Sequence, residues 1–329
     1  MIYIDTASKD IYYNFAVEEY FSAEKDLGDS IFLLWRTPPM LVMGQFQSIY
    51  REVDMAYAQE NHIGIARRRS GGGAVYLDEG AWLYTYWFPR TTYADIDFQK
   101  NSAGVVDALR KLGLNISFSG RNDILADGKK ICGNARYCVN GGVLHHGTLL
   151  FSTDMNVLSR ALTPDKEKIQ SKGVRSVRSR VANISDLLNS SMDSNEFGQY
   201  MIKEVTKDCI EYQMTQEDLT RIREIADRYR SWEWIYGKEP KFQFRRQKRL
   251  PGGLLSVGVD VQNGRVAELE INGDFFCRGS MEEFKRLFVG QKFDRETFLS
   301  CVQTGCLDAD HFFDQISFHD FLDIVFGEV

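Results

Sequence analysis

The stretch Arg67–Tyr76, RRRSGGGAVY, constrains the fold most, because three cations run directly into three consecutive glycines and then into a β-prone apolar segment. Glycine accepts positive φ and, without a Cβ, lets a ligand approach the backbone N–H groups closely. Arginine stays charged at any working pH and can donate two parallel hydrogen bonds to a phosphate. The pattern indicates an anion-binding loop, and a solvated surface turn is the alternative with the same composition.

The segments on both sides of this loop favour strands. Residues 63–66 read IGIA, and residues 81–88 read AWLYTYWF, in which large aromatic and other side chains alternate. We therefore expect the order strand, glycine loop, strand. A P-loop or a dinucleotide fingerprint would need a helix after the loop, and neither GxxxxGK[ST] nor GxGxxG occurs in the chain. A nucleotide, if one binds, is held in another way.

Composition excludes several classes of protein. The chain has 329 residues, 40 of them basic and 46 acidic, and the net charge of -6 argues against a nucleic-acid binder that acts through its whole surface. It has no run of 18 apolar residues and no charged-then-apolar leader, so we expect a soluble, cytoplasmic protein with no membrane partner. Its six cysteines are scattered without metal-ligand spacing, which favours reduced, mostly buried thiols.

The rest of the chain reads as alternating helices and strands. We expect helices over 14–21 and 101–112, strands over 31–35, 41–43 and 144–151, a hairpin turn at Asp127-Gly128, and a helix that begins at a Thr215 cap. Beyond residues 238–250 the pattern changes to a hairpin over 254–271 and a capping box at 280–283. The sequence predicts two domains, residues 1–243 and 244–329.

Four segments, taken in order and spacing, resemble the lipoate-protein ligase family. They are residues 67–78, 120–124 (GRNDI), 130–135 (KICGNA) and 145–150 (HHGTLL). Residues 42–45, 172–181 and 232–234 also resemble that family, so the likeness covers residues 1 to 240, and it is weaker beyond them. The resemblance implies an α+β fold, with a mixed-sheet catalytic domain of the biotin and lipoate ligase type, related to class II synthetases, and a small α+β accessory domain.

The resemblance also implies a two-step reaction. Lipoate attacks the α-phosphate of ATP to give lipoyl-adenylate and pyrophosphate, and a lysine of a lipoyl carrier domain then displaces AMP. The carriers implied are E2 subunits of 2-oxoacid dehydrogenases and the glycine cleavage H protein, and the enzyme is expected to be a monomer. Two anions must meet in the first step, so a basic, glycine-rich loop and Mg²⁺ suit the chemistry.

The family pattern assigns site residues by position. Lys130 is the expected catalytic residue, because its ammonium can polarise the acyl carbonyl and balance the departing AMP. Contacts to ATP or lipoyl-adenylate are expected from Arg68, Ser70, Gly71, Gly72, Gly73, Ala74, Val75, Tyr76, Asn122, Asp123, Lys130, Gly133, Ala135, His146 and Gly147. A mobile basic loop carrying Lys172, Arg175 and Arg178 is expected to fold over the adenylate or dock the carrier. Mg²⁺ is expected to be held by the phosphates, with Asp123 as its candidate protein ligand.

Each assignment has a plainer alternative. Lys130 follows another lysine, and without residues 131–135 after it the pair would indicate the solvated face of a hairpin. Asp123 could cap a turn, and His145 has the pattern of a structural histidine. The basic stretches 166–180 and 241–249 could be a solvated loop and a linker. We expect the first to dock an acidic carrier and make no prediction for the second.

The sequence departs from its family at four positions. Leu77 stands where His is common, Ala81 where Asn is common, Cys132 where Ser or Ala is usual and Ser48 where Asn is usual. Leu77 and Ala81 replace polar groups expected near the ligand, so we expect altered acyl or acceptor preference with adenylation retained.

Three other functions compete with the ligase. An octanoyltransferase would need a nucleophilic cysteine downstream of the His-Gly strand, and residues 139–208 contain none. A biotin ligase would carry a Gly-Arg-Gly-Arg pattern instead of Arg-Ser before the glycines. A non-catalytic protein that binds lipoyl-adenylate or a carrier would fit the lost His and Asn.

Overall fold

The computed structural model describes residues 1–45, 47, 49–91, 97–119, 122–162, 180–237, 242–275, 280–304, 312–313 and 315–327. The chain divides into two compact units, Met1–Ile235 and Tyr236–Val329. The boundary expected after residue 243 falls inside β12 (Phe242–Leu250), the first strand of the second unit.

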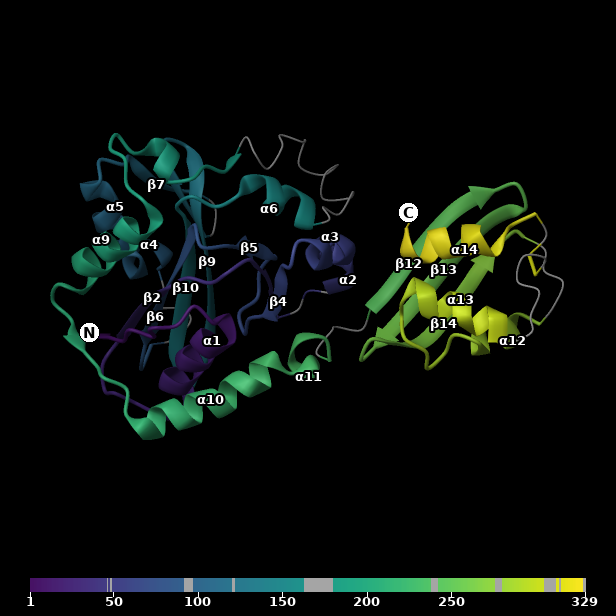
Figure 1. Ribbon diagram of the computed structural model, residues 1–329, viewed down its shortest axis with the longest axis horizontal. Helices are drawn as coiled ribbons and strands as arrows, with labels where there is room; N and C mark the ends of the chain where they lie inside the picture. Colours follow the sequence, from purple (N-terminus) through teal and green to yellow (C-terminus); the bar gives the residue numbers. More distant parts are fainter. Residues whose placement is uncertain are drawn as a thin grey trace. The chain divides into compact units, whose positions relative to one another are not determined.

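The first unit is built on an eight-stranded mixed sheet (Figure 1). The short strand β1 pairs parallel with both of its neighbours, β11 and β2, and the other pairs are antiparallel. The mixed sheet predicted from the sequence is confirmed. In spatial order the strands are β11 (Ile210–Glu211), β1 (Ile2–Tyr3), β2 (Ile31–Trp35), β6 (Ala81–Phe88), β10 (Gly142–Leu150), β9 (Lys129–Val139), β8 (Asp123–Ala126) and β7 (Ile116–Ser119).

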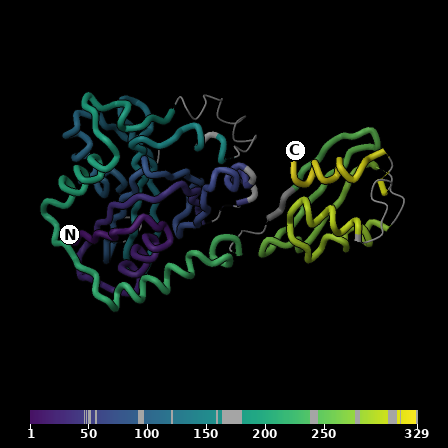
Figure 2. Tube along the Cα trace, in the orientation of Figure 1, coloured from purple at the N-terminus to yellow at the C-terminus, as the bar shows by residue number. Residues whose placement is uncertain are grey.

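Helices cover both faces of this sheet. Helices α5 (Ala103–Lys111) and α9 (Ser194–Thr206) pack on one face, and α1 (Ile11–Glu19) and α10 (Gln216–Arg230) pack on the other. The alternation in β6 explains this, because Trp82, Tyr84 and Tyr86 enter the first core while Leu83 and Trp87 enter the second. Figure 2 shows α1 and α10, far apart in sequence, running side by side.

A second, three-stranded sheet holds the glycine motif. Its order is β4 (Gly64–Arg67), β3 (Met40–Met43), β5 (Val75–Leu77), with β3 parallel to β4 and antiparallel to β5. The predicted strand, loop, strand order is confirmed. Leu77 and Ala81, which stand where the family commonly has polar residues, are both fully buried in the apolar core that includes α1, and their effect on acyl or acceptor preference stays a prediction. Because their side chains are apolar, Leu77 and Ala81 can be buried in this core without a hydrogen-bond partner.

The helix boundaries predicted for the first unit agree in part with those of the structure. Thr215 caps α10 and its hydroxyl accepts from the Asp218 N–H, as predicted. The helix expected over 101–112 is divided at Ser102 into α4 and α5. The remaining helical segments are α2 (Ile49–Glu52), α3 (Met55–Glu60), α4 (Phe98–Asn101), α6 (Met155–Ala161), α11 (Trp232–Ile235), a π-helical turn η1 (Tyr20–Glu24) and a 3-10 turn η3 (Ser185–Leu187).

The second unit has its own sheet and core. Strands β12, β13 (Gly253–Gln262) and β14 (Arg265–Gly273) form an antiparallel sheet, and α12 (Met281–Arg286), α13 (Arg295–Thr304) and α14 (Phe318–Phe326) contribute phenylalanines to a core against it. A linker was one interpretation of the stretch 241–249, and its described part, residues 242–249, forms most of β12. It pairs with β13 along its length, and its cations Arg245 and Arg249 lie beside Glu270 and Asp274.

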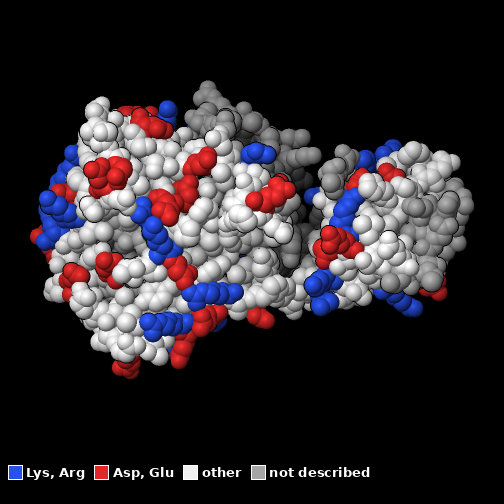
Figure 3. Space-filling view, viewed as in Figure 1, with Lys and Arg blue, Asp and Glu red and all other residues white. Residues whose placement is uncertain are grey.

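Charged side chains are interspersed on the visible surface. Lysines and arginines alternate with acidic residues on the face in Figure 3. Among the described residues, the structure has no helix that is both long and apolar enough to span a bilayer.

Candidate active site

The glycine loop spans the gap between β4 and β5 and is held by tight backbone packing. Gly72 has a φ of 98°, which glycine adopts without strain. Gly44, just after β3, fits against it so closely that a Cβ there would lie 2.2 Å from the Gly72 carbonyl oxygen. Gly72 and Gly73 are exposed. The loop therefore presents open backbone while its base is fixed.

Arg68 supports the loop from beneath. Its Nη2 donates to the carbonyls of Gly71 and Gly73 at 2.9 and 2.8 Å, its Nη1 to Val42 at 3.1 Å, and its Nε to Ser70 Oγ at 3.0 Å. Burial lowers the pKa of Arg68 to about 10, so the side chain stays charged at neutral pH. No carboxylate among the described residues pairs with it. A buried cation without an acid beside it favours a bound anion.

Ser70 connects this loop to the large sheet. Its Oγ lies 2.6 Å from His146 Nε2, and His146 Nδ1 lies 3.6 Å from Glu18 Oε2. Ser70 Oγ accepts from Arg68 Nε and still has one proton and a second lone pair, so the direction of its bond to His146 Nε2 depends on the tautomer of the ring. All four side chains are buried. The sequence predicted Ser70 and His146 but missed Glu18, whose position in an amphipathic helix gave no signal of burial.

Lys130 lies at the start of β9, paired with Asp123 on β8. The distance from Lys130 Nζ to Asp123 Oδ1 is 2.8 Å, and both side chains are about one-third exposed. A register shift between Ile124 and Leu125 aligns Lys130 beside Leu125, and such irregularities re-aim side chains. Gly133 makes room, because a Cβ there would lie 3.1 Å from Lys130 Nζ. The ammonium is therefore accessible and fixed in direction.

The register of β9 and β10 brings the two halves of the site together. His146 pairs with Ala135, and Thr148 pairs with Gly133, two residues further along. Positions two apart share a face, so His146 and the glycine under the Lys130 ammonium lie on one face, about 7 Å apart along the strands. The glycine loop, through Ser70, thus meets the Lys130 hairpin across this face.

Asn134 is a site residue that the sequence did not single out. Its backbone N–H and its Nδ2 both donate to the Asn122 carbonyl, at 2.9 and 3.0 Å, and Asn122 Nδ2 donates back to the Asn134 carbonyl at 2.7 Å. This clasp fixes the residue before Asp123. Gly147 serves the same packing, because a Cβ there would lie 2.5 Å from Asn134 Oδ1. A buried asparagine in a strand is recognised only once its partners are known.

Other predicted residues have mixed placements. Tyr76 is buried, and burial raises its pKa to about 12, while Ala74, Val75 and Ala135 are half-buried. Lys172, Arg175 and Arg178 lie outside the described residues. Contacts of the predicted residues with a ligand stay a prediction.

The structural interpretation of His145 holds in part. Its Nε2 lies 3.0 Å from Asn134 Oδ1, and burial lowers its pKa to about 3, so the ring is neutral. Its Nδ1 has no hydrogen-bond partner among the described residues. Within the described ranges, no three or more His, Cys, Asp or Glu side chains are grouped to hold a metal ion.

The cysteines differ from the expectation of mostly buried thiols. Of the four that the structure describes, Cys132 is buried, Cys138 is exposed, and Cys209 and Cys301 are intermediate. Burial raises the pKa of Cys132 to about 12, which leaves it a thiol at neutral pH.

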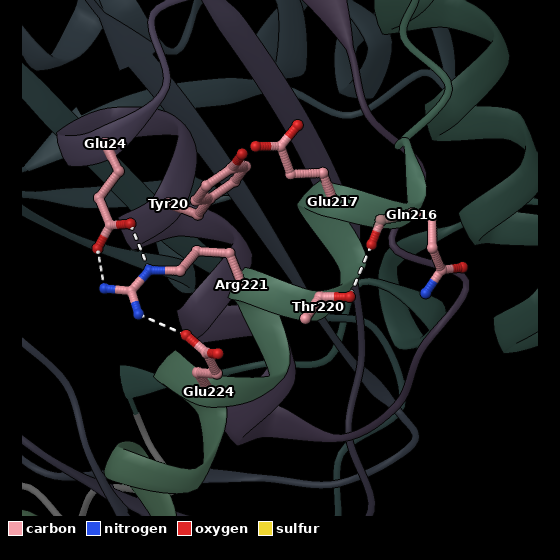
Figure 4. Close-up of a pocket in the computed structure, with 7 residues that line it drawn as sticks. All are labelled: Tyr20, Glu24, Gln216, Glu217, Thr220, Arg221 and Glu224. Atoms are coloured by element: carbon pink, nitrogen blue, oxygen red, sulfur yellow. Dashed lines mark hydrogen bonds and ion pairs between the residues drawn. The ribbon is translucent and has the colours of Figure 1, made fainter.

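A surface pocket lies away from this site, between η1 and α10 (Figure 4). Three of its charged side chains pair with one another, because Arg221 bonds to Glu24 at 2.7 and 3.0 Å and to Glu224 at 2.6 Å. None of the predicted site residues lines it. The lining residues are Tyr20, Glu24, Gln216, Glu217, Thr220, Arg221 and Glu224.

Comparison with known proteins identifies the family. Residues 10–206 match the lipoyl protein ligase A/B catalytic domain, and residues 239–325 match the bacterial lipoate protein ligase C-terminus. The chain belongs to the lipoate-protein ligase family. It is a two-domain ligase, as the sequence resemblance predicted.

Individual relatives agree over most of the chain. A lipoate-protein ligase of Bacillus subtilis, LplJ, is 35% identical and covers 99% of this chain and 100% of its own length. The bipartite ligase of Thermoplasma acidophilum comes from a structural analysis of an archaeal lipoylation system that comprises the ligase and its E2 lipoyl domain. It has a TM-score of 0.62 and 30% identity, covering 73% of this chain and 97% of that one. A lipoate-protein ligase A bound with ATP has a TM-score of 0.59 and 29% identity, covering 72% and 98%. These likenesses confirm the predicted fold of the catalytic unit.

Proposed function

We propose that this ligase activates lipoate with ATP to lipoyl-AMP and then transfers the lipoyl group to a specific lysine of a lipoyl carrier domain. The observation that carries the proposal is the buried Arg68 guanidinium, without an acidic partner among the described residues, under a glycine loop with exposed backbone. The ATP bound to a similar ligase supports the nucleotide.

In the first step, the lipoate carboxylate attacks the α-phosphorus, a P–O bond forms and pyrophosphate leaves. Both reactants are anions, so the positive charge of Arg68 and the open loop amides lower their repulsion. Arg68 donates to four protein acceptors and has one N–H left for a phosphate oxygen. We therefore assign it two roles, as support of the loop and as its positive charge.

In the second step, the carrier amine attacks the acyl carbonyl, the C–N bond forms, the C–O bond to phosphate breaks, and AMP leaves as the amine releases its proton. Lys130 would stabilise the oxygen charge that develops, because its ammonium is fixed by Asp123 at 2.8 Å yet one-third exposed. The Asn122–Asn134 clasp holds this pair in place.

Mg²⁺ would be held mainly by phosphate oxygens. The described residues offer no cluster of ligands, and Asp123, the candidate protein ligand, is shared with Lys130. When bound, the ion would screen the charge of the triphosphate.

Neither Cys132 nor Cys138, the two cysteines on β9, suits the role of the nucleophile in a cysteine-based acyl transferase. Cys132 is fully buried with its pKa raised to about 12, and the exposed Cys138 lies at the far end of β9 from Lys130. A nucleophile must be both accessible and readily ionised.

An E2 lipoyl domain is the carrier we propose first, because the Thermoplasma ligase was studied together with one. The glycine cleavage H protein is the second candidate. The test is the intact mass of each carrier after incubation with the enzyme, lipoate, Mg²⁺ and ATP, with ATP omitted and the acceptor lysine replaced by arginine as controls. We expect one lipoyl group per carrier, dependent on ATP. Transfer without ATP, or no lipoate-dependent exchange of pyrophosphate into ATP, would contradict the proposal.

A further inference from the structure

Arg67, the first of the three arginines, is one of the most buried side chains in the protein and has no part in the chemistry above. Its exposed fraction is 1%. Its Nη1 lies within hydrogen-bond distance of the carbonyls of Gly44, Gln45 and Gln47, at 3.0, 3.3 and 2.7 Å. One guanidinium therefore lies beside three backbone carbonyls that are close in sequence, those of Gly44, Gln45 and Gln47.

The backbone of Gly44 and Gln45 forms the base of the glycine loop. Gln45 N–H donates to the Ser70 carbonyl at 2.9 Å, and Gly44 packs against the Gly72 carbonyl with no space for a Cβ. The backbone of Gly44 and Gln45 is in direct contact with that of Ser70 and Gly72. Loss of the Arg67 hydrogen bonds would therefore also loosen the glycine loop.

The other end of Arg67 is fixed by α11, the last helical turn of the first unit. Arg67 Nε donates to the Ile235 carbonyl at 2.8 Å, and Trp234 Nε1 donates to the Arg67 carbonyl at 2.9 Å. Helix α11 packs beside β4. Ile235 is the last residue of the first unit, so this reciprocal pair ties the end of that unit directly to the arginine run.

We propose that Arg67 and Trp234 are positioning residues that set the shape of the glycine loop for its anion. Trp234 fixes α11 on β4, and α11 supplies the acceptor that orients the Arg67 guanidinium. The guanidinium in turn holds the backbone of Gly44 and Gln45 under the loop. The proposal rests on the proposed function where it names ATP as the anion. Neither residue touches the reacting atoms.

The test compares Trp234→Phe with Trp232→Phe. The first substitution removes the Nε1 donor to Arg67 while keeping an aromatic ring beside Tyr229, whose ring centroid lies 4.7 Å from that of Trp234. The second removes an equivalent indole from the same turn at a side chain that is 44% exposed. Lipoate-dependent pyrophosphate exchange gives the KM for each substrate.

We expect Trp234→Phe to raise the KM for ATP about fivefold, the factor that corresponds to one lost hydrogen bond, with the KM for lipoate unchanged and Trp232→Phe like the wild type. Hydrogen exchange of the backbone amides over residues 68–77 should be faster in Trp234→Phe alone. If the wild type catalyses no exchange of pyrophosphate, the proposed function fails while this amide measurement still tests the loop.

Three outcomes would overturn the inference, two of them from the tryptophan variants and one from an arginine variant. One is amide exchange over 68–77 that is the same in both variants and the wild type. Another is an equal rise in both KM values, which would make the effect a general loss of stability. Arg67→Lys, which keeps the charge but has fewer donors, should reproduce the rise in the KM for ATP if that variant folds, and a KM equal to that of the wild type would also contradict the proposal.

Discussion

Three consecutive arginines carry the same side chain into three different environments. Arg67 is sealed in the core and bonds to backbone carbonyls. Arg68 lies under the glycine loop as a buried charge. Arg69 is partly exposed, 3.2 Å from Glu19, with its guanidinium over the Tyr137 ring. At the scale of the residue, the role of an arginine depends on the acceptors that surround it. Three identical residues in a row do not reveal these differences in environment.

Substitution of Lys130 tests its proposed catalytic role directly. Lys130→Gln should lower kcat for carrier lipoylation about 100- to 1,000-fold, the range for removing one group that stabilises developing charge. Stability should change little, because the side chain is one-third exposed. The adjacent Lys129, which is exposed, provides the matched control Lys129→Gln. Equal activity of the two variants in a single-turnover transfer assay would remove Lys130 from the mechanism.

At the scale of elements, buried polar side chains lock helices to strands. Asp218 in α10 is fully buried and accepts hydrogen bonds from Tyr20, Lys25, Tyr212 and the Thr215 N–H. It therefore joins η1, the segment after β11 and the start of α10. Burial alone would raise the pKa of Asp218, but the Lys25 ammonium and the other donors outweigh it and hold the pKa well below its usual range.

This network predicts an acid-sensitive contribution to stability. A carboxylate whose pKa is depressed in the folded state stabilises above its unfolded pKa of about 3.9, and the contribution is lost as pH falls below that value. Asp218→Asn should lower the free energy of unfolding by about 3 kcal/mol near neutral pH, the cost typical of breaking a buried ion pair.

The pH dependence of urea unfolding checks this contribution. The difference between wild type and Asp218→Asn should shrink as the pH is lowered through the unfolded pKa. Asp227→Asn provides the control, because Asp227 is exposed on the same helix and pairs with Arg230. A difference between wild type and Asp218→Asn that stays constant with pH would show that the network does not depend on the charge.

At the scale of the whole molecule, the two units have separate cores. The core of the second unit is formed by residues of β13, β14 and its helices, with Phe284, Phe288 and Phe321 fully buried. A unit that buries its own apolar surface can fold without the rest of the chain.

We therefore expect the fragment 236–329 to fold by itself. It should show a single cooperative transition in thermal unfolding followed by circular dichroism, together with dispersed methyl resonances from its core. A gradual, non-cooperative change would mean that this unit depends on the first one for its stability.

The sequence by itself determined the class of protein and the nature of its loop. Glycine spacing, alternation in 81–88 and the Thr215 cap are local signals, so they predicted the strand, loop, strand order and the start of α10. The resemblance to the family predicted Ser70 and His146 as site residues, but it did not predict that their side chains meet.

The tertiary structure decided the partners. Leu77 and Ala81 are buried in the core, and residues 242–250 form a strand and not a linker. Arg67 donates a hydrogen bond to Ile235 in α11, which is 168 residues away along the chain. None of these can be read from sequence, because burial and long-range pairing depend on which segments the fold brings together. The physical reason is that the effect of a charge or an amide depends on its hydrogen-bond partners and on its burial, and both are set only by the tertiary fold.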